Sequence, residues 1–190
     1  VDLKESCLRS ETTVKVFDQM RKLQGFTDEG SPGRDWNVAT GMVIEGKAGF
    51  QIMGDWAKGE FTAAGKVPGV DYYCAATPSN NGYLYNVDSF IFYKTSDPDK
   101  QEGQKLLAKL MMGKNFQKVF NLYKGSIPAR LDVPMDEFDK CAKTSNADIK
   151  TAGAKGGLVP SFAHGMAQGN TMKAALQDVI TEHFNSDMSS

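Results

Sequence analysis

Histidine and cysteine, which bind transition metals more often than other residues, are scarce in this sequence, with 2 histidines and 3 cysteines. The cysteines at positions 7, 74 and 141 lie far apart, and no CxxC pair occurs. Zinc and iron–sulfur sites need clusters of such residues, so we expect neither a metal site nor another cofactor. Three cysteines leave room for one disulfide and one unpaired thiol.

An excess of basic charge is also missing, because 22 Lys and Arg residues stand against 23 Asp and Glu residues. Proteins that bind a phosphate backbone carry basic patches, so nucleic acid is not an expected partner. The longest apolar runs, such as Phe90–Tyr93, are far shorter than the roughly 20 residues that span a bilayer. Residues 1–5 contain neither the basic nor the apolar segment of an export signal, so we expect either a cleaved signal or a start within a longer protein.

Common catalytic and nucleotide-binding motifs are absent as well. The sequence contains no GxSxG, GxxxxGK[ST] or HExxH motif, and no GxGxxG motif after a predicted strand. The glycines at positions 153, 156 and 157 lack the preceding strand that a nucleotide-binding loop requires. They are better interpreted as a flexible turn.

The 190 residues are enough to fold as one large domain or as two small lobes. Apolar residues on one helical face predict helices near 13–24, 36–45, 98–111 and 116–123, one that starts around 135–141, and a last one over 170–184. Short apolar runs bounded by turn residues predict strands at 48–54, 70–76 and 85–93. Strands that alternate with pairs of helices indicate an α/β fold.

The two tryptophans stand at junctions between predicted elements. Trp36 and Trp56 each follow an aspartate and lie outside the apolar helical faces. A flat indole beside carboxylates suits a sugar ring, whose C–H face stacks on aromatic rings while its hydroxyls bind polar groups. Packing in the core is the alternative for both residues. The pair therefore raises the hypothesis of a carbohydrate site.

Two carboxylates lie near the ends of predicted strands, where α/β sheets present side chains that contact ligands. Asp88 falls inside an apolar run, where a buried carboxylate needs a partner, so functional and structural roles both stay open. Asp55 is better interpreted as a cap for the helix that follows Gly54. Used as acid and base, the two aspartates could hydrolyse a glycosidic bond, so a glycoside hydrolase is a hypothesis from a different class.

Lys124 and His164 lie in loops that are rimmed by glycine, where their donor groups would not be hidden by a helix. For each of them, an ordinary surface position is the alternative. The second histidine, His183, falls on the last predicted helix and is interpreted as structural.

Several stretches resemble the extracellular solute-binding proteins of bacterial sugar ABC transporters, in particular the glucose/mannose-binding subgroup. In order along the chain they are Gly46–Trp56, Cys74–Pro78, Asn86–Phe90, Lys124–Asp132 and Pro160–His164. The similarity covers nearly the whole chain, and its several parts together are more specific than any one motif. It implies a periplasmic-binding-protein-like α/β fold of two lobes joined by a hinge, with one sugar bound between them.

By this resemblance, the protein is a non-enzymatic periplasmic receptor that binds a monosaccharide and delivers it to the membrane permease subunits of an ABC importer. The subgroup's sugar-contacting positions that match this sequence are Trp36, Trp56, Asp88, Lys124 and His164. The resemblance also assigns residues 1–84 and 131–190 to the second lobe and residues 85–130 to a segment that crosses into the first lobe.

The resemblance, which extends over nearly the whole chain, further predicts a disulfide between Cys74 and Cys141, with Cys7 left free, because the periplasm permits disulfides. Family members are longer and begin with a signal and an N-terminal segment that builds most of the first lobe. This sequence resembles their C-terminal half, so the missing N-terminal half is an expected partner. The alternative is an isolated lobe that has no sugar affinity and serves only as an interaction module.

Overall fold

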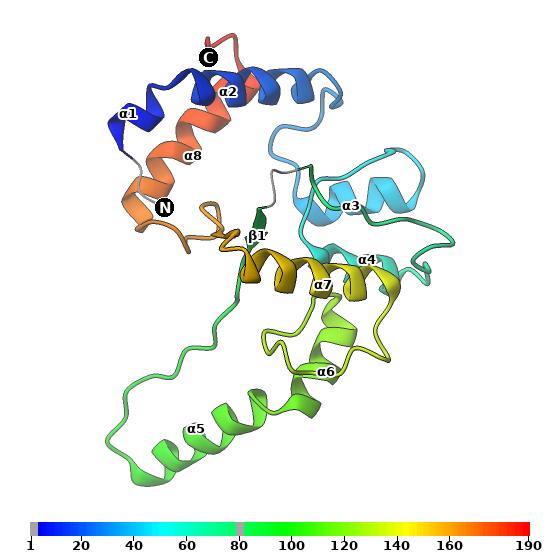
Figure 1. Ribbon diagram of the computed structural model, residues 1–190, viewed down its shortest axis with the longest axis vertical. Helices are drawn as coiled ribbons and strands as arrows, with labels where there is room; N and C mark the ends of the chain where they lie inside the picture. The colour runs from blue at the N-terminus through cyan, green and yellow to red at the C-terminus, as the bar shows by residue number, and fades with distance from the viewer. Residues whose placement is uncertain (1–3, 79–81) are drawn as a thin grey trace. The chain divides into compact units, whose positions relative to one another are not determined.

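The computed structural model describes residues 4–78 and 82–190, and the chain divides into two compact units (Figure 1). One unit contains the residues up to Arg34, residues 84–86 and residues 159–190. The other runs from Asp35 to Tyr83 and from Val87 to Leu158. In the described parts of the chain, no helix is long and apolar enough to span a membrane.

In its described residues, the first unit contains the helices α1 (Glu5–Leu8), α2 (Glu11–Gln24) and α8 (Asn170–Asn185). Helix α2 covers the predicted range 13–24 and starts two residues earlier, after Ser10, whose side chain accepts a hydrogen bond from the amide of Thr13 (3.3 Å). Helix α8 packs against α2 (Figure 1). The pair forms the body of this unit.

His183 lies at the contact between α2 and α8 and is almost completely buried. Its Nε2 atom lies 3.0 Å from the carbonyl oxygen of Phe17, and its ring meets the Phe17 ring edge to face. Arg21, which like Phe17 belongs to α2, donates to the carbonyl oxygen of Met188 (2.9 Å). The same carbonyl oxygen lies 3.1 Å from Nδ1 of His183. These contacts hold the chain end against α2 and agree with the structural interpretation of His183.

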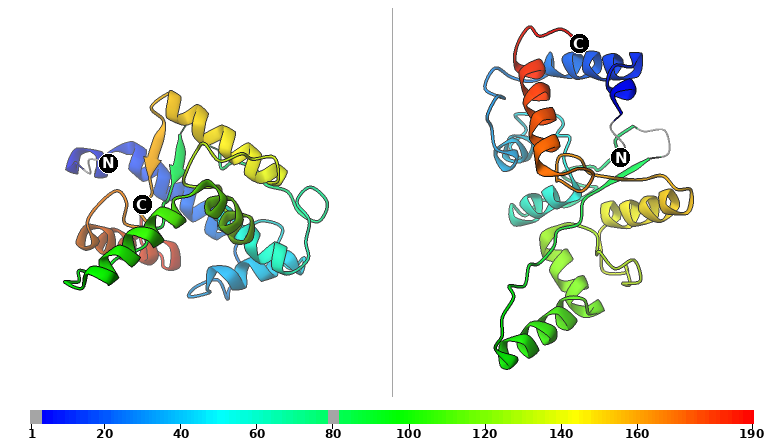
Figure 2. Two further views of the ribbon diagram at one scale, coloured as in Figure 1. Left: turned by 90° about the horizontal axis from the view of Figure 1, so that it is seen from below. Right: turned by 90° about the vertical axis from the view of Figure 1, so that its left-hand side faces the viewer.

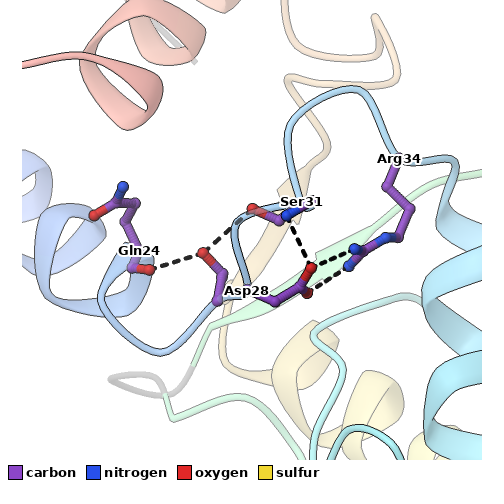
Figure 3. A network of polar contacts seen from close by, with 6 residues as sticks. Gln24, Asp28, Ser31 and Arg34 are labelled. Carbon is purple, nitrogen blue, oxygen red and sulfur yellow. Dashed lines mark hydrogen bonds and ion pairs between the residues drawn. The ribbon is translucent and has the colours of Figure 1, made fainter.

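The loop after α2 is organised by an ion pair (Figure 3). Arg34 donates from both of its terminal nitrogens to the carboxylate of Asp28, at 2.7 and 2.5 Å. The Asp28 carboxylate also accepts from the amide of Gly30 (3.0 Å). The hydrogen bond from Arg34, which outweighs the effect of burial, lowers the pKa of Asp28 to about 2.

The second unit holds most of the helices, which are α3 (Trp36–Ile44), the 3₁₀ helix η1 (Asp55–Ala57), α4 (Lys58–Ala63), α5 (Pro98–Met111), α6 (Lys114–Lys124) and α7 (Lys140–Ala154). Helix α5 starts as predicted, with Pro98 in its first turn and the Asp97 carboxylate accepting from two amides. The buried core of this unit includes Val133, Phe138 and Ala142.

A disulfide joins Cys74 to Cys141 within the second unit, with 5.7 Å between their Cα atoms. The pair that the resemblance predicts is therefore the pair that the structure joins. The bond attaches the irregular segment around Cys74 to the first turn of α7. Cys7 is exposed and free.

A single two-stranded sheet occurs in the described residues, formed by β1 (Tyr83–Tyr85) and β2 (Leu158–Pro160) (Figure 2). The Tyr83 amide donates to the Gly157 carbonyl (2.9 Å), and the Ser161 amide donates to the Tyr85 carbonyl (2.8 Å). This offset is that of parallel strands.

The sequence-based strand predictions are largely wrong. Residues 48–54 and 70–76 are irregular, apart from an isolated bridge between Pro68 and Tyr72, and the strand expected at 85–93 ends at Tyr85. Strands are stabilised by hydrogen bonds to a neighbouring strand, and no strand in the described chain pairs with these segments. Their apolar side chains are exposed accordingly, with Phe50 96% and Ile91 80% accessible. The expected α/β fold is thus seen only as helices with one small sheet.

Candidate functional site

Trp56 lies in the 3₁₀ turn η1, and its indole is half-buried. The six-membered part of the ring covers Gly54 so closely that a Cβ atom at position 54 would lie 2.1 Å from a ring carbon. Only glycine fits at position 54 with the indole in this place. The turn therefore fixes Trp56 against its own backbone.

Asp55, the residue before Trp56, does not cap the following helix as predicted. Neither η1 nor α4 has a side-chain cap. The Asp55 carboxylate instead accepts a hydrogen bond from the amide of Ile127 (2.9 Å) and another from the hydroxyl of Ser126. Burial raises the pKa of Asp55, against the opposing effects of the Ile127 amide and of the Lys58 charge. The capping interpretation failed because the competing donors lie about 70 residues away in the chain, in a loop that local sequence does not reveal.

The end of α6 meets the start of α4 with its backbone. Gly125 ends α6 with φ at +90°, and a Cβ atom there would lie 2.5 Å from the amide nitrogen of Gly59. A Cβ atom on Gly59 would lie 2.8 Å from the carbonyl oxygen of Lys124. Both glycines are needed for this close approach, which places Lys124 beside the helix that follows Trp56.

Lys124 and Asp88 are brought together although they are far apart in sequence. The Nζ atom of Lys124 lies 2.5 Å from Oδ2 of Asp88 and 5.8 Å from the centre of the Phe120 ring. Phe90, from the same segment as Asp88, packs edge to face on Phe120. The Asp88 side chain is 67% exposed, so its carboxylate stays open to a ligand. An ion pair this exposed stabilises the fold little.

Trp36 is the first residue of α3, and its side chain is half-exposed. Its carbonyl oxygen accepts from the hydroxyl of Thr40 (3.0 Å) and from the side-chain amide of Gln51 (2.9 Å). Thr40, which is fully buried, also donates to Gln51 (2.8 Å). Gln51 ties the irregular segment to α3, and its place as the polar residue in an apolar run was the available sequence signal for this contact.

His164 belongs to the other unit and lies in the turn after β2. Its Nδ1 atom is 2.7 Å from the hydroxyl of Ser161, a buried residue. The Ser161 hydroxyl also accepts from the amide of His164 (3.4 Å). The ring is thus oriented by its own turn.

Two polar contacts of the second unit were not foreseen from the sequence. Lys58, although its side chain is only 8% exposed, pairs with Asp139 at 2.7 Å. Asp139 also caps α7, and although burial opposes it, the hydrogen bonds from Lys58 and from the Ala142 amide lower its pKa. The hydroxyls of Tyr83 and Ser145 lie 2.6 Å apart. The capping role of Asp139 could have been predicted, because an aspartate precedes the helical pattern of α7. Nothing in the local sequence indicates that Lys58 is buried.

The arrangement supplies an exposed carboxylate, an ammonium group over an aromatic ring and two partly exposed indoles. In the described residues, no group of three or more His, Cys, Asp or Glu side chains is placed to hold a metal ion. Each of the aspartates considered for acid–base chemistry has its own partner, the Ile127 amide for Asp55 and Lys124 for Asp88. The chemistry is that of hydrogen bonding to hydroxyls and stacking on a ring.

Comparison with known sequences identifies the family of this chain. The sequence profile of the bacterial extracellular solute-binding protein family matches residues 1–152. The chain belongs to this family.

Among its relatives in the solute-binding protein family are proteins named probable sugar-binding periplasmic protein. That of Brucella suis is 48% identical over the whole chain, and that of Rhizobium meliloti is 44% identical over the whole chain. An uncharacterised ABC transporter extracellular-binding protein of Pyrococcus horikoshii is 33% identical over 90% of the chain. The chain spans 45%, 46% and 38% of the lengths of these three proteins.

Proposed function

We propose that this chain is part of the substrate-binding component of an ABC sugar importer and that it binds a monosaccharide of the glucose or mannose type. The observation that carries the proposal is the exposed Asp88–Lys124 pair beside Phe120, in the same unit as both tryptophans. The names of the relatives from Brucella suis and Rhizobium meliloti support a sugar as the ligand.

Each of these groups has a role that fits a sugar. The Asp88 carboxylate accepts hydrogen bonds from ring hydroxyls, and the Lys124 ammonium group donates to them; both bonds are strengthened by charge. The indoles of Trp36 and Trp56 offer flat faces to the C–H side of the ring. His164, which the resemblance adds to this set, contributes a donor or acceptor to the same ligand.

The wider proposal concerns the complete protein. It operates in the periplasm as a two-lobed receptor without enzymatic activity, and it passes the sugar to membrane permease subunits. Residues 1–84 and 131–190 belong to one lobe, and residues 85–130 cross into the other. Closure of lobes around a ligand is a common way for binding proteins to present a new surface to a partner.

The test is isothermal titration of the full-length protein with glucose and mannose, comparing wild type with Asp88→Ala. We expect the variant to lose at least about tenfold in affinity, because it removes a charge-assisted hydrogen bond. Asp18→Ala is the matched control, since it removes the same charge from an exposed position on α2. Binding by Asp88→Ala at the wild-type level, or release of phenol from aryl glycosides by the wild type, would contradict the proposal.

A further inference from the structure

Asp55 is a mostly buried carboxylate that the proposed sugar contacts do not use. It occupies the first position of η1, directly before Trp56. Its Oδ2 atom accepts from the Ile127 amide at 2.9 Å, and the Ser126 hydroxyl donates to the same carboxylate. Both donors belong to the loop that begins one residue after Lys124. One side chain therefore connects the turn that carries Trp56 to the loop that follows Lys124.

A second contact between the same two segments leaves them little freedom to shift. The backbone of Gly125 lies against that of Gly59, with no room for a Cβ atom on either residue. Trp56 is held in turn by its contact with Gly54. The glycines permit the close approach of the segments, but they carry no side chain that selects one register. The hydrogen bonds from the Ile127 amide and the Ser126 hydroxyl to Asp55 are side-chain contacts that join η1 to this loop.

We propose that Asp55 is a positioning residue for the sugar site: its carboxylate fixes the loop after Lys124 relative to Trp56, without touching the sugar. This inference rests on the proposed function. Asp55 faces two cationic groups, Lys58 and Lys124, whose charges favour its ionised form, and the phenol of Tyr83. Burial raises the pKa of Asp55, and the two donors of the loop and the two nearby cations oppose this effect by stabilising the carboxylate form.

Two substitutions of Asp55 are expected to differ in their effect on the loop. Asp55→Ala removes both acceptor oxygens and leaves the Ile127 amide and the Ser126 hydroxyl without their partner. Asp55→Asn keeps one carbonyl oxygen of similar shape, which can still accept from the Ile127 amide. A role as hydrogen-bond acceptor predicts partial rescue by asparagine, which keeps one acceptor oxygen, whereas a role that needs the negative charge predicts that alanine and asparagine affect the loop equally.

The first test measures the loop directly, through hydrogen exchange of the Ile127 amide by NMR in the full-length protein. We expect exchange to be at least about tenfold faster in Asp55→Ala than in wild type, and close to wild type in Asp55→Asn. Ser126→Ala, which removes one donor and keeps the carboxylate, is the milder variant should Asp55→Ala fail to fold. We expect Ser126→Ala to shift the Ile127 amide resonance, because this resonance reports the hydrogen bond that remains between the Ile127 amide and Asp55. An Ile127 amide that is unchanged in Asp55→Ala would overturn the proposal.

The second test measures glucose affinity in the same variants. We expect Asp55→Ala to weaken binding at least about tenfold and Asp55→Asn about threefold, with circular dichroism unchanged. An Asp55→Ala protein that has a faster Ile127 amide and wild-type affinity would overturn the positioning role. If wild type binds no sugar, the proposed function fails, and the positioning role is decided by the Trp56 indole and Lys124 amide resonances. Those resonances should move together in Asp55→Ala and stay in place in Asp55→Asn, and immobile resonances would overturn it.

Discussion

At the scale of single residues, the charged groups of the second unit differ sharply in what they contribute. The Lys58–Asp139 pair is largely withdrawn from solvent, whereas the Lys124–Asp88 pair is open on its carboxylate side. A buried charge that loses its partner destabilises a protein, while an exposed pair contributes little. The first pair therefore belongs to the fold, and the second is available for binding.

Replacing Lys58 by methionine tests the structural pair. We expect Lys58→Met to lower the free energy of unfolding by about 2 kcal/mol, because Asp139 loses a charge-assisted hydrogen bond. Urea denaturation measures the change. Lys47→Met is the matched control, since Lys47 pairs with Glu45 on the surface (side chains 68% and 58% exposed), and it should change stability by less than about 0.5 kcal/mol. Equal effects of the two substitutions would contradict this account of Lys58.

The Asp28–Arg34 pair gives a prediction about pH. Because the pKa of Asp28 is lowered from 3.8 to about 2, folding stability from this group is fully present above pH 3.8 and is lost as the pH falls towards 2. An NMR titration of the Asp28 carboxyl should show a midpoint near 2 in wild type. In Arg34→Ala the midpoint should return towards 3.8. A wild-type midpoint near 3.8 would show that the pair does not form in solution.

At the scale of elements, helices could be predicted from the sequence better than strands. The start of α2 at Ser10 and that of α5 at Asp97 and Pro98 follow from capping chemistry, which is local. The apolar runs at 48–54 and 70–76 were predicted as strands because their composition fits one, but a strand needs a neighbour that local sequence does not supply. The contact of Asp55 with Ile127 was not predicted either, because its partner is also distant in the sequence.

The close approach of α4 and α6 at Gly59 and Gly125 can be tested by adding one methyl group to a glycine. Gly125→Ala should lower the free energy of unfolding by about 3 kcal/mol, because it combines a positive φ with a clash against Gly59. Gly65→Ala is the control, since Gly65 also has a positive φ (+71°) but open space around it, and it should cost about 1 kcal/mol. Chemical denaturation of both variants measures the difference, and equal losses would show that the close approach is not tight.

At the scale of the whole molecule, the disulfide is the strongest long-range link in the second unit. It joins residues 67 positions apart, and a crosslink that closes a loop of this length stabilises by about 4 kcal/mol in the chain-entropy estimate. The denatured, unreduced chain should contain one reactive thiol, that of Cys7, and the reduced chain three. Thiol titration measures both numbers. Three thiols without reduction would contradict the disulfide.

The residues proposed to bind the sugar show how much the sequence predicts at this scale. Chemistry and family resemblance together predicted Trp36, Trp56, Asp88, Lys124 and His164, and the structure brings Asp88 into contact with Lys124. The first four share one unit, and His164 lies in the other. Local patterns could predict these side chains, but they could not predict the contact between Asp88 and Lys124. Those two residues are 36 positions apart and meet through tertiary packing, in which Phe90 contacts Phe120.

The most direct test of the central claim is tryptophan fluorescence of the full-length protein during a glucose titration, in wild type and in Trp56→Phe. A sugar stacked on the indole should produce a saturable change in wild type, and the substitution should remove most of that change and weaken binding several-fold. Trp36→Phe should likewise reduce the signal. A saturable change of the same size and midpoint in all three proteins, or no change in wild type, would contradict the account.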